Sequence, residues 1–571
     1  MKFAHSPLLS QLLPAWRARF VLLLLLGGFA ALTVRSLYLQ EVNSDFLQQK
    51  GESRYSRVIE LSATRGRITD RHGDMLAVST PVKSVWAIPE DATLQPAQVR
   101  RLAGLLEIDV RELHRKLASE RDFVFLKRQI PPDVADKVAA LRLPGIHQQR
   151  EYRRYYPAGE LTAHVLGFTG VDDTGQEGVE LAFNDQLAGR PGSRRVIKDR
   201  RGEIIEDVES IREPQDGRDI TLALDSKVQY LAYANLKQAI TTHKAKAGGI
   251  VVIDVKTGEV LALTNLPAYN PNNRGKLAGS QLRNRVLTDA FEPGSTMKPF
   301  TAALALDKGK VRFDTPIQTA PGRITIGNAT ISDAHPHGVL TVAQVIQKSS
   351  NVGATKLALS MSPEEMWQMF DVVGFGTAPG LGFPGEAGGR LRPHKTWKPI
   401  EQATMSYGHG ISVSLMQLAR AYLAFARDGD VIPLSLTRTS EPAPGSRQVF
   451  SVQTARELRI MLEMAVQPGG TAPKAQVPGY RVAGKTGTAH KLDGGIYTDR
   501  YVSSFVGFAP VSDPRLVVAV MIDEPGAGKY YGGEVAAPVF SQVMAGALRT
   551  LGVAPDAPLK PLQMAEARER M

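Results

Sequence analysis

The longest apolar stretch of the chain lies near its N-terminus. The 15 residues Phe20–Val34 carry no charge, with arginines on both sides and with Trp16 and Tyr38 just beyond them. A helix that crosses a membrane needs about 20 apolar residues, but aromatic rings and outward-reaching arginines at its ends extend such a segment. The pattern predicts a transmembrane helix over residues 17–39, and a cleaved signal peptide is the alternative.

Charge around this stretch predicts its orientation. Lys2, Arg17 and Arg19 precede it, and no acidic residue does. Because positive residues favour the cytoplasmic side, residues 1–16 are predicted to form a cytoplasmic tail and the chain beyond Tyr38 to lie outside. No second apolar stretch of that length follows, which indicates a single-pass protein.

A first folded region without candidate chemistry is predicted after the span. Residues 65–79 read as two strands joined by a turn at Asp70–Gly73. Apolar residues recur at helical spacing over 99–117, and the stretch 153–170 is predicted as loop and strand. His164 lies in that stretch with no acid–base constellation around it in the sequence, which favours a structural role.

A boundary near Pro214–Arg218 separates this region from a larger one. The elements predicted in the larger region are strands at 220–224, 249–254, 260–263, 503–509 and 516–522, and helices at 228–239 and 539–551. The hairpin between the second and third strands turns at Lys256-Thr257-Gly258. Strands at both ends with helices between them predict an antiparallel sheet with packed helices, an α+β domain.

Composition narrows the classes of function. The chain has 571 residues and a formal charge of +12, which suits an anionic membrane or cell-wall surface. No basic stretch with interleaved aromatic residues and no other nucleic-acid motif occurs, so no nucleic-acid partner is predicted. The chain has no cysteine, which excludes disulfides, thiolate metal sites and a thiol nucleophile. Residues 555–571 are rich in Pro, Ala and charge and predict a mobile tail.

The first group of candidate catalytic residues lies around Ser295. Glu292-Pro293-Gly294 predicts a turn before it, and the apolar run from Pro299 predicts a helix after it. Lys298 then lies about one turn further on the same face. Burial or a second cation lowers the pKa of a lysine from about 10.4, and a neutral Lys298 becomes a general base for the Ser295 hydroxyl.

A second polar string, Ser349-Ser350-Asn351, follows an apolar segment at 340–346. The Ser349 hydroxyl is a candidate relay for a proton between Lys298 and a leaving amine. Asn351 has amide donors and an acceptor, which suit a substrate amide. These two residues complete a candidate acid–base group with the first string.

The third string is Lys485-Thr486-Gly487-Thr488, in a predicted strand that begins at Tyr480. Lys485, Thr486 and Thr488 are candidates to hold a substrate carboxylate. Lys485 also supplies a second cation near Lys298, and Gly487 is predicted to let the substrate backbone come close. The backbone amides of Ser295 and Thr488 are candidates for an oxyanion hole.

Each string alone is weak evidence. Ser-Ser-Asn is most often a turn or a helix cap, and the earlier Lys256-Thr257-Gly258 is itself predicted as a plain turn. All three in this order match the S-x-x-K, S-x-N and K-T-G signature of penicillin-recognising serine acyl-transferases. No Gly-x-Ser-x-Gly elbow surrounds Ser295. We therefore predict an active-site serine that takes an acyl group from a peptide and passes it on.

Further strings make the resemblance more specific. The chain resembles class B penicillin-binding proteins, and within them the septal, FtsI-like transpeptidases of Gram-negative bacteria. The similarity covers nearly the whole chain and includes Arg65–Ser79, Arg154–Gly159, Asn270–Arg274, Arg283–Arg285, Phe291–Phe300, Lys348–Gly353, Gly382–Glu386, Tyr530–Gly533 and Ala537–Phe540. So many shared strings, spread along the chain, favour a member of this family over a chance match.

The resemblance implies a fold and a set of domains. After the tail (1–16) and the transmembrane helix (17–39), it implies an elongated α+β pedestal similar to a penicillin-binding protein dimerisation domain (40–217). A transpeptidase domain (218–554) follows, with an antiparallel sheet and helices on both faces. The catalytic domain is then periplasmic, the N-terminus is cytoplasmic, and the protein is anchored in the inner membrane.

The resemblance also implies function and partners. It implies a D-alanyl-D-alanine transpeptidase that cross-links stem peptides of lipid II-derived glycan during septal synthesis, without a metal or cofactor. It implies inhibition by β-lactams. A glycosyltransferase of the SEDS type and other divisome membrane proteins are the implied partners.

Other functions share the three motifs. An elongation-type transpeptidase, a D,D-carboxypeptidase or a serine β-lactamase are the enzyme alternatives, and the long pedestal and anchor argue against the last. A β-lactam sensor or a divisome scaffold with a vestigial site is the non-enzyme alternative. Intact Ser295, Lys298, Ser349, Asn351 and Lys485 argue against a vestigial site.

The chain departs from the family pattern at two places. The family often reads Tyr-Gly-Tyr-Gly where this chain has Tyr407-Gly408-His409-Gly410, and Gly469–Ala472 is a variable form of a glycine-rich loop. We expect neither departure to touch the acyl-transfer residues. His409 is expected to lie near the site. It either influences contact with inhibitors or is a neutral replacement.

Overall fold

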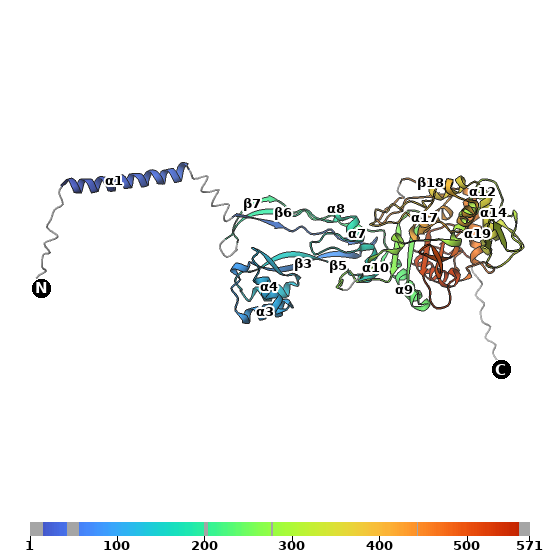
Figure 1. Cartoon of the computed structure of the whole chain (residues 1–571), viewed down its shortest axis with the longest axis horizontal. Coiled ribbons are helices and arrows are strands. Elements are labelled where there is room, and N and C mark those ends of the chain that lie inside the picture. The colour runs from blue at the N-terminus through green and yellow to red at the C-terminus, as the bar shows by residue number, and fades with distance from the viewer. Residues whose placement is uncertain (1–14, 43–55, 199–203, 276–277, 442–443, 559–571) are drawn as a thin grey trace, which may run out of the picture.

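The structure is a computed structural model that describes residues 15–42, 56–198, 204–275, 278–441 and 444–558. An N-terminal helix, an elongated β-rich pedestal and a larger domain of mixed helices and strands follow one another along the chain (Figure 1).

The predicted transmembrane segment is a single long helix. Helix α1 spans Ala15–Leu37, and a π-helical turn, Tyr38–Val42, continues it. None of the α1 residues is buried against the rest of the protein, so its apolar side chains need another environment, which a bilayer supplies. The predicted span over 17–39 falls inside this continuous segment.

Two sheets build the pedestal (Figure 1). In the first, the antiparallel order is β1-β6-β7. In the second, β3 pairs antiparallel with β2, β4 and β5, and β2 also pairs in parallel with β8. The strands are β1 (Ser56–Leu61), β2 (Ile68–Thr69), β3 (Met75–Ala87), β4 (Val124–Ile130), β5 (Ile146–Tyr155), β6 (Gly192–Lys198), β7 (Ile204–Arg212) and β8 (Ile220–Thr221).

A small core sits on one part of this second sheet. Helices α3 (Pro96–Leu106) and α4 (Val110–Leu117), which confirm the helical spacing over 99–117, pack there with α5 (Pro132–Ala139). Leu102, Leu113 and Leu126 are among the buried side chains of this cluster. Asp109 starts α4 by accepting hydrogen bonds from two backbone N–H groups.

Two sequence expectations for this region need correction. His164 lies in a short helix, α6 (Ala163–Leu166), rather than in loop or strand, because its ring packs against Tyr269 and its Nε2 contacts the Gln281 carbonyl oxygen. Burial lowers its pKa to about 4. The strand predicted over 220–224 ends at Thr221, because Asp225 caps the next helix.

A buried ionic cluster lies within the pedestal. Glu180 accepts a hydrogen bond from Arg65 Nε at 2.7 Å on one carboxylate oxygen and from Arg154 Nε at 2.7 Å on the other. All three side chains are at most 2% exposed. Charges removed from water in this way depend on their partners, so the cluster fixes Arg65 and Arg154 relative to one another.

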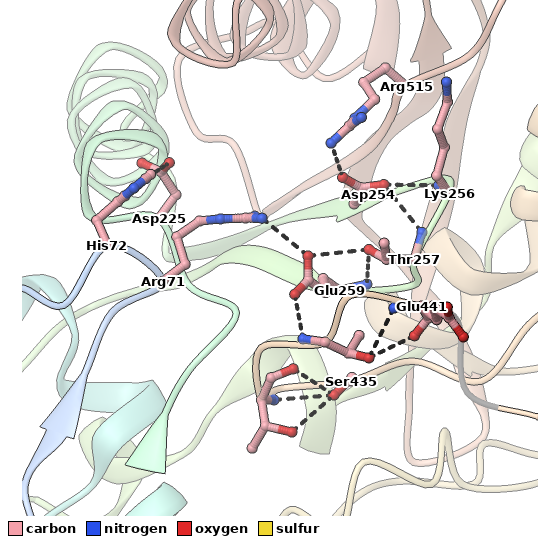
Figure 2. A network of polar contacts seen from close by, with 12 residues as sticks. Arg71, His72, Asp225, Asp254, Lys256, Thr257, Glu259, Ser435, Glu441 and Arg515 are labelled. Carbon is pink, nitrogen blue, oxygen red and sulfur yellow. Dashed lines mark hydrogen bonds and ion pairs between the residues drawn. The ribbon is translucent and has the colours of Figure 1, made fainter. Parts of the chain in front are cut away.

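The two domains meet at a polar network (Figure 2). Arg71 of the pedestal pairs with Glu259 at 3.2 Å, and His72 contacts Asp225 at 2.9 Å. Glu259 is almost fully buried and also accepts a hydrogen bond from the Thr439 backbone N–H. The β2–β3 turn is thus attached directly to the larger domain.

The larger domain is centred on one antiparallel sheet with the order β10-β9-β21-β20-β19. Its strands are β9 (Ala247–Asp254), β10 (Val260–Leu266), β19 (Ala483–Asp493), β20 (Ile496–Ala509) and β21 (Leu516–Asp523). The hairpin β9–β10 confirms the turn predicted at Lys256-Thr257-Gly258.

Both faces of this sheet are covered by helices. Helices α9 (Ser226–His243) and α21 (Ala537–Thr550) share one cluster with Ile250 and Val252 of β9. The alternate residues of the same strand, Val251 and Ile253, belong to the cluster on the other face, beneath α17 (Leu415–Ala421). This alternation confirms an antiparallel sheet with helices on both faces.

Of the remaining elements, two short helices within residues 178–187 belong to the pedestal, and the others lie in the larger domain. The helices not yet named are α7 (Gly178–Ala182), α8 (Asn184–Leu187), α10 (Gly279–Leu282), α11 (Arg285–Thr288), α12 (Lys298–Asp307), α13 (Val342–Lys348), α14 (Asn351–Leu359), α15 (Pro363–Val372), α16 (Pro399–Met405), α18 (Leu423–Ala426), α19 (Val452–Val466) and α20 (Gly532–Val535). Four short strand pairs are β11 (Ala290–Phe291) with β16 (Val413–Ser414), β12 (Pro316–Gln318) with β15 (Val339–Thr341), β13 (Arg323–Ile326) with β14 (Ala329–Ser332), and β17 (Asp430–Val431) with β18 (Arg447–Gln448).

Candidate active site

Ser295 lies in a 3₁₀ turn, Gly294–Met297, that leads directly into α12. The Lys298 backbone N–H donates to the Ser295 carbonyl oxygen, so the lysine follows the serine by one tight turn. Gly294 has a φ of +60°, a conformation that glycine adopts without strain. The predicted turn-to-helix junction is therefore present.

Lys298 is buried, and its ammonium group points to the second motif. Its Nζ donates to the Ser349 hydroxyl oxygen at 3.0 Å and also to the Ser349 carbonyl oxygen. Burial is the main cause that holds the pKa of Lys298 well below its ordinary value, and the nearby Lys485 adds to it. Asp333 acts in the opposite direction on this pKa.

Ser349 owes its position to an unusual backbone conformation. It ends α13 with a φ of +60°, which is rare for a residue with a side chain. Ser350 then starts α14 as its N-cap and donates its hydroxyl to Asp333 at 2.8 Å. Asp333 also accepts the Val352 backbone N–H at 2.9 Å. Asp333, which sequence reasoning missed, thus fixes the turn that carries Ser349.

Asn351 is the first residue of α14, and its side chain is held from one side. Its Nδ2 donates to the Ser332 carbonyl oxygen of β14 at 2.8 Å. The side-chain amide is therefore oriented by the protein itself, with one of its donors already used.

Lys485 occupies a fully buried position on β19. Its Nζ donates to the hydroxyl oxygens of Thr486, at 3.2 Å, and of Thr471, at 3.5 Å. Burial lowers the pKa of Lys485 to about 7. Thr471 belongs to the glycine-rich loop 469–472, so the expectation that this loop leaves the acyl-transfer residues untouched is wrong. The loop was visible in the sequence, but its contact depends on the tertiary fold.

The third motif lies against the turn that carries Ser295. A Cβ on Gly487 would lie 2.7 Å from the Pro293 carbonyl oxygen and would collide with the Ser504 hydroxyl. Gly487 therefore makes room for the protein's own backbone, which differs from the predicted approach of a substrate. A Cβ on Gly294 would lie 3.3 Å from the Thr488 backbone nitrogen. The backbones of Thr488 and of the Ser295 turn, which carry both predicted oxyanion-hole amides, are thus neighbours.

The Tyr407–Gly410 departure is also in contact with this turn. Gly408 approaches Gly294 so closely that a Cβ would collide with its backbone. His409 Nδ1 lies 3.5 Å from a carboxylate oxygen of Glu292, three residues before Ser295. The loop thus packs on the Ser295 turn at Gly294 and Glu292, and the expectation that this departure leaves the acyl-transfer residues themselves untouched stays a prediction.

Two family models match the chain. The penicillin binding protein transpeptidase domain matches residues 248–545, and the penicillin-binding protein dimerisation domain matches residues 60–222. These ranges coincide broadly with the larger domain and the pedestal. The finer domain limits expected from the sequence, 40–217, 218–554 and 555–571, stay predictions.

Several relatives share most of the chain. A probable peptidoglycan D,D-transpeptidase PenA of Neisseria gonorrhoeae is 46% identical over 95% of this chain and 94% of its own length. The peptidoglycan D,D-transpeptidase FtsI of Escherichia coli K12 is 43% identical over 95% of this chain and 93% of its own length.

Solved structures agree with these relatives. The transpeptidase domain of Burkholderia pseudomallei penicillin-binding protein 3 is 54% identical with a TM-score of 0.55, and covers 59% of this chain and 98% of that one. A peptidoglycan synthetase of Bifidobacterium adolescentis is 25% identical with a TM-score of 0.71, and covers 88% of this chain and 98% of that one. The chain therefore belongs to the penicillin-binding protein transpeptidase family, among its class B members of the FtsI and PenA type.

Proposed function

We propose that this chain is a peptidoglycan D,D-transpeptidase that works through an acyl-enzyme on Ser295. The observation that carries the proposal is the buried amine of Lys298, one tight turn after Ser295 and 3.0 Å from the Ser349 hydroxyl. The similarity to the PenA and FtsI peptidoglycan D,D-transpeptidases supports this reaction class.

Acylation begins with proton transfer. Burial and the neighbouring Lys485 disfavour the charged form of Lys298, so its neutral amine accepts the Ser295 proton. The Ser295 oxygen attacks the carbonyl carbon between the two D-alanines of a stem peptide. The oxyanion is stabilised by the backbone amides of Ser295 and Thr488.

The leaving group and the acceptor use the same acid–base group. When the C–N bond breaks, the departing D-alanine amine takes the proton from Lys298, with the Ser349 hydroxyl as relay. An amine of a second stem peptide then attacks the Ser295 ester, and its released proton returns through Lys298 to the Ser295 oxygen. One amide is lost, one amide forms, and the enzyme is regenerated.

The remaining motif residues bind the donor peptide. Lys485, Thr486 and Thr488 hold the terminal carboxylate, and substrate binding restores charge to Lys485 because a carboxylate raises the pKa of a neighbouring amine. Asn351 contacts a substrate amide, and Gly487 keeps β19 close to the Ser295 turn. A β-lactam presents a strained amide and a carboxylate to the same groups, so it acylates Ser295.

One labelling experiment tests this chemistry. The full-length chain should be labelled covalently by a fluorescent penicillin, and Ser295→Ala should lose the label while keeping its circular dichroism spectrum. Ser360→Ala, at an exposed serine in the same domain, is the matched control and should label normally. A peptide map that places the adduct on another residue would contradict the proposal.

The cellular setting completes the proposal. Helix α1 anchors the chain in the inner membrane, with the N-terminus in the cytoplasm and the catalytic domain in the periplasm. The FtsI relative supports a role in septal cell-wall synthesis. A membrane glycosyltransferase of the SEDS type supplies the glycan strands, since the two matched family domains leave polymerisation to another protein.

A further inference from the structure

A cavity of about 470 Å³ is lined by segments that are adjacent in the chain to Ser295 and Thr488. Strand β19 continues from Thr488 into the lining at Ala489–Leu492, and Glu292, also in the lining, precedes Ser295 by three residues. The titratable residues of the lining are Glu292, Arg390, Arg392, His490, Lys491 and Tyr497. A group bound here is adjacent to the segment that carries the acyl ester.

Glu292 presents a negative charge to this cavity. Its side chain is 13% exposed, and it accepts the Gly410 backbone N–H at 2.8 Å and the Tyr497 hydroxyl at 3.1 Å. Across the residues that the structure describes, no lysine or arginine forms an ion pair with it. His409 is a second titratable neighbour beside Tyr497, with its Nδ1 at 3.5 Å, and burial lowers the pKa of its imidazole despite the opposing effect of Glu292.

The Glu292 carboxylate accepts hydrogen bonds from a phenol and a backbone amide, so a cation from outside would complete its set of partners. Burial lowers the pKa of the His409 imidazole from its ordinary value, which disfavours the charged form of this neighbour. His409, Tyr497 and the Gly410 amide therefore orient Glu292 without neutralising it.

The lining of the same cavity also contains positively charged residues. Arg392 pairs with Glu401 at 2.6 Å, and Lys491 pairs with Asp523 and Glu524 at 2.7 Å. Arg390 is exposed, and within the described ranges its guanidinium makes no hydrogen bond or ion pair. The cavity thus holds one anion and one cation that the protein does not pair with opposite charges.

We propose that this cavity is the subsite for the acyl acceptor, with Glu292 binding its ammonium group and Arg390 binding a carboxylate beside that amine. The inference rests on the transpeptidase function proposed above, and it defines the acceptor as an amphoteric group rather than a plain alkylamine. The ammonium gives one proton to solvent before attack. The amine then forms the new C–N bond, the Ser295 ester C–O bond breaks, and the second proton passes through Lys298 to the Ser295 oxygen.

His409 is a positioning residue in this scheme. It contacts Glu292 and packs edge-on against Tyr407 and at a tilt against Tyr497, with ring centroids 5.3 and 5.8 Å away. Its imidazole therefore limits the directions in which the Glu292 carboxylate can turn, and it leaves the charge for the acceptor.

Acceptor competition tests the subsite. The full-length chain in detergent is acylated with a thioester donor peptide. The acyl-enzyme is then offered D-alanine, which has an amine and a carboxylate, or D-alaninamide, which has the amine but lacks the negative charge of the carboxylate. We expect wild type to favour D-alanine by about tenfold, the value of one charge-assisted contact. The ratio of the two transfer products, with D-alanine and with D-alaninamide, is independent of the acylation rate.

Variants test which residue binds the carboxylate and which binds the ammonium group of the acceptor. Arg390→Ala should abolish the preference for D-alanine, and Arg390→Lys should keep part of it. Glu292→Gln should lower transfer to both acceptors relative to hydrolysis of the acyl-enzyme. Arg323→Ala, which removes an exposed arginine of β13 outside the cavity, is the matched control and should keep the wild-type ratio.

The outcomes separate the two proposals. If wild type forms no acyl-enzyme, the proposed function itself fails. If wild type acylates normally but uses both acceptors equally, or if Arg390→Ala keeps the full preference, the acceptor subsite is wrong and the acyl-enzyme chemistry stands. Should Glu292→Gln not fold, the Arg390 variants still decide the question.

Discussion

The ammonium nitrogen of Lys298 lies 3.0 Å from the hydroxyl oxygen of Ser349, although 51 positions separate the two residues in the chain. The contact joins the start of α12 to the turn between α13 and α14, and Lys485 reaches the same site from β19. The acid–base group therefore exists only in the folded domain. Its properties follow from burial as much as from the identity of the residues.

The two lysines should respond differently to replacement by arginine. Lys298→Arg should lose acylation by roughly 10²–10⁴-fold, because a guanidinium cannot accept a proton at neutral pH. Lys485→Arg should keep a measurable part of the rate, because it preserves the charge that holds the carboxylate. Stopped-flow acylation by a fluorescent penicillin measures both. Lys308→Arg, at an exposed position after α12, is the control, and a near wild-type rate for Lys298→Arg would exclude it as the base.

Acylation should depend on pH at both ends of the range. As the pH falls through the depressed pKa of Lys298, the amine gains a proton and can no longer accept one from Ser295, so the rate falls. As the pH rises through about 7, the pKa of Lys485, its charge is lost and binding of the substrate carboxylate weakens. The second-order acylation rate, measured from about pH 5 to about pH 9, should be bell-shaped.

Lys485→Arg provides the internal control for this profile. Its guanidinium stays charged at all these pH values, so the fall on the alkaline side should disappear while the fall on the acidic side remains. If the fall in rate on the alkaline side persists in this variant, that fall arises from the titration of a group other than Lys485.

The sequence supplied candidate residues for this site but not its geometry. Motif spacing selected Ser295 and Lys298, which the fold places one tight turn apart, and short runs of apolar residues predicted strands such as β9 and β21. Asp333 and Thr471 were missed, because each contacts a motif residue through the tertiary fold. Short-range patterns carry no information on such contacts.

The errors in the fold have the same physical origin. His164 was placed in loop or strand, whereas packing against Tyr269 from the other domain favours a short helix there. The left-handed conformation of Ser349 could not be predicted either, because serine rarely adopts it and only the surrounding structure enforces it.

The buried pedestal cluster should contribute strongly to stability. Glu180→Gln leaves Arg65 and Arg154 buried without their carboxylate, which should lower the free energy of unfolding by about 3–5 kcal/mol. Urea unfolding followed by intrinsic fluorescence measures this. Glu107→Gln, which alters a pair with Lys127 whose acid is 86% exposed, should change stability by less than about 1 kcal/mol. Equal effects of the two substitutions would contradict a special role for the cluster.

Membrane topology should follow the charges around α1. Protease added to intact spheroplasts should digest the pedestal and the larger domain, because they are predicted to face outward, and should spare an N-terminal epitope. A version with Lys2, Arg17 and Arg19 replaced by Glu is expected to insert less efficiently in this orientation. Protection of the large domain would reverse the topology. A mature N-terminus beyond Ala31 would identify a cleaved signal peptide instead.

The septal role can be separated from the chemistry in cells. Depletion of the protein should give filaments with blocked septa, since cross-linking would stop at division sites. Swollen or rounded cells would favour an elongation-type transpeptidase. A chimera with residues 1–60 replaced by an unrelated anchor should retain penicillin labelling and divide poorly, because the partner contacts would be lost. Normal division by the chimera would contradict a role of the N-terminal segment in partner binding.

The close approach of Gly408 and Gly294 restricts how this enzyme can evolve under drug selection. A side chain at position 408 would collide with the Gly294 backbone, and one at position 294 would press on the Thr488 backbone of β19. Either substitution would disturb the Ser295 turn. Mutational routes to drug tolerance through this loop are therefore limited to the flanking positions 407 and 409, and surveys of tolerant isolates should find their substitutions beside the glycines and not at them.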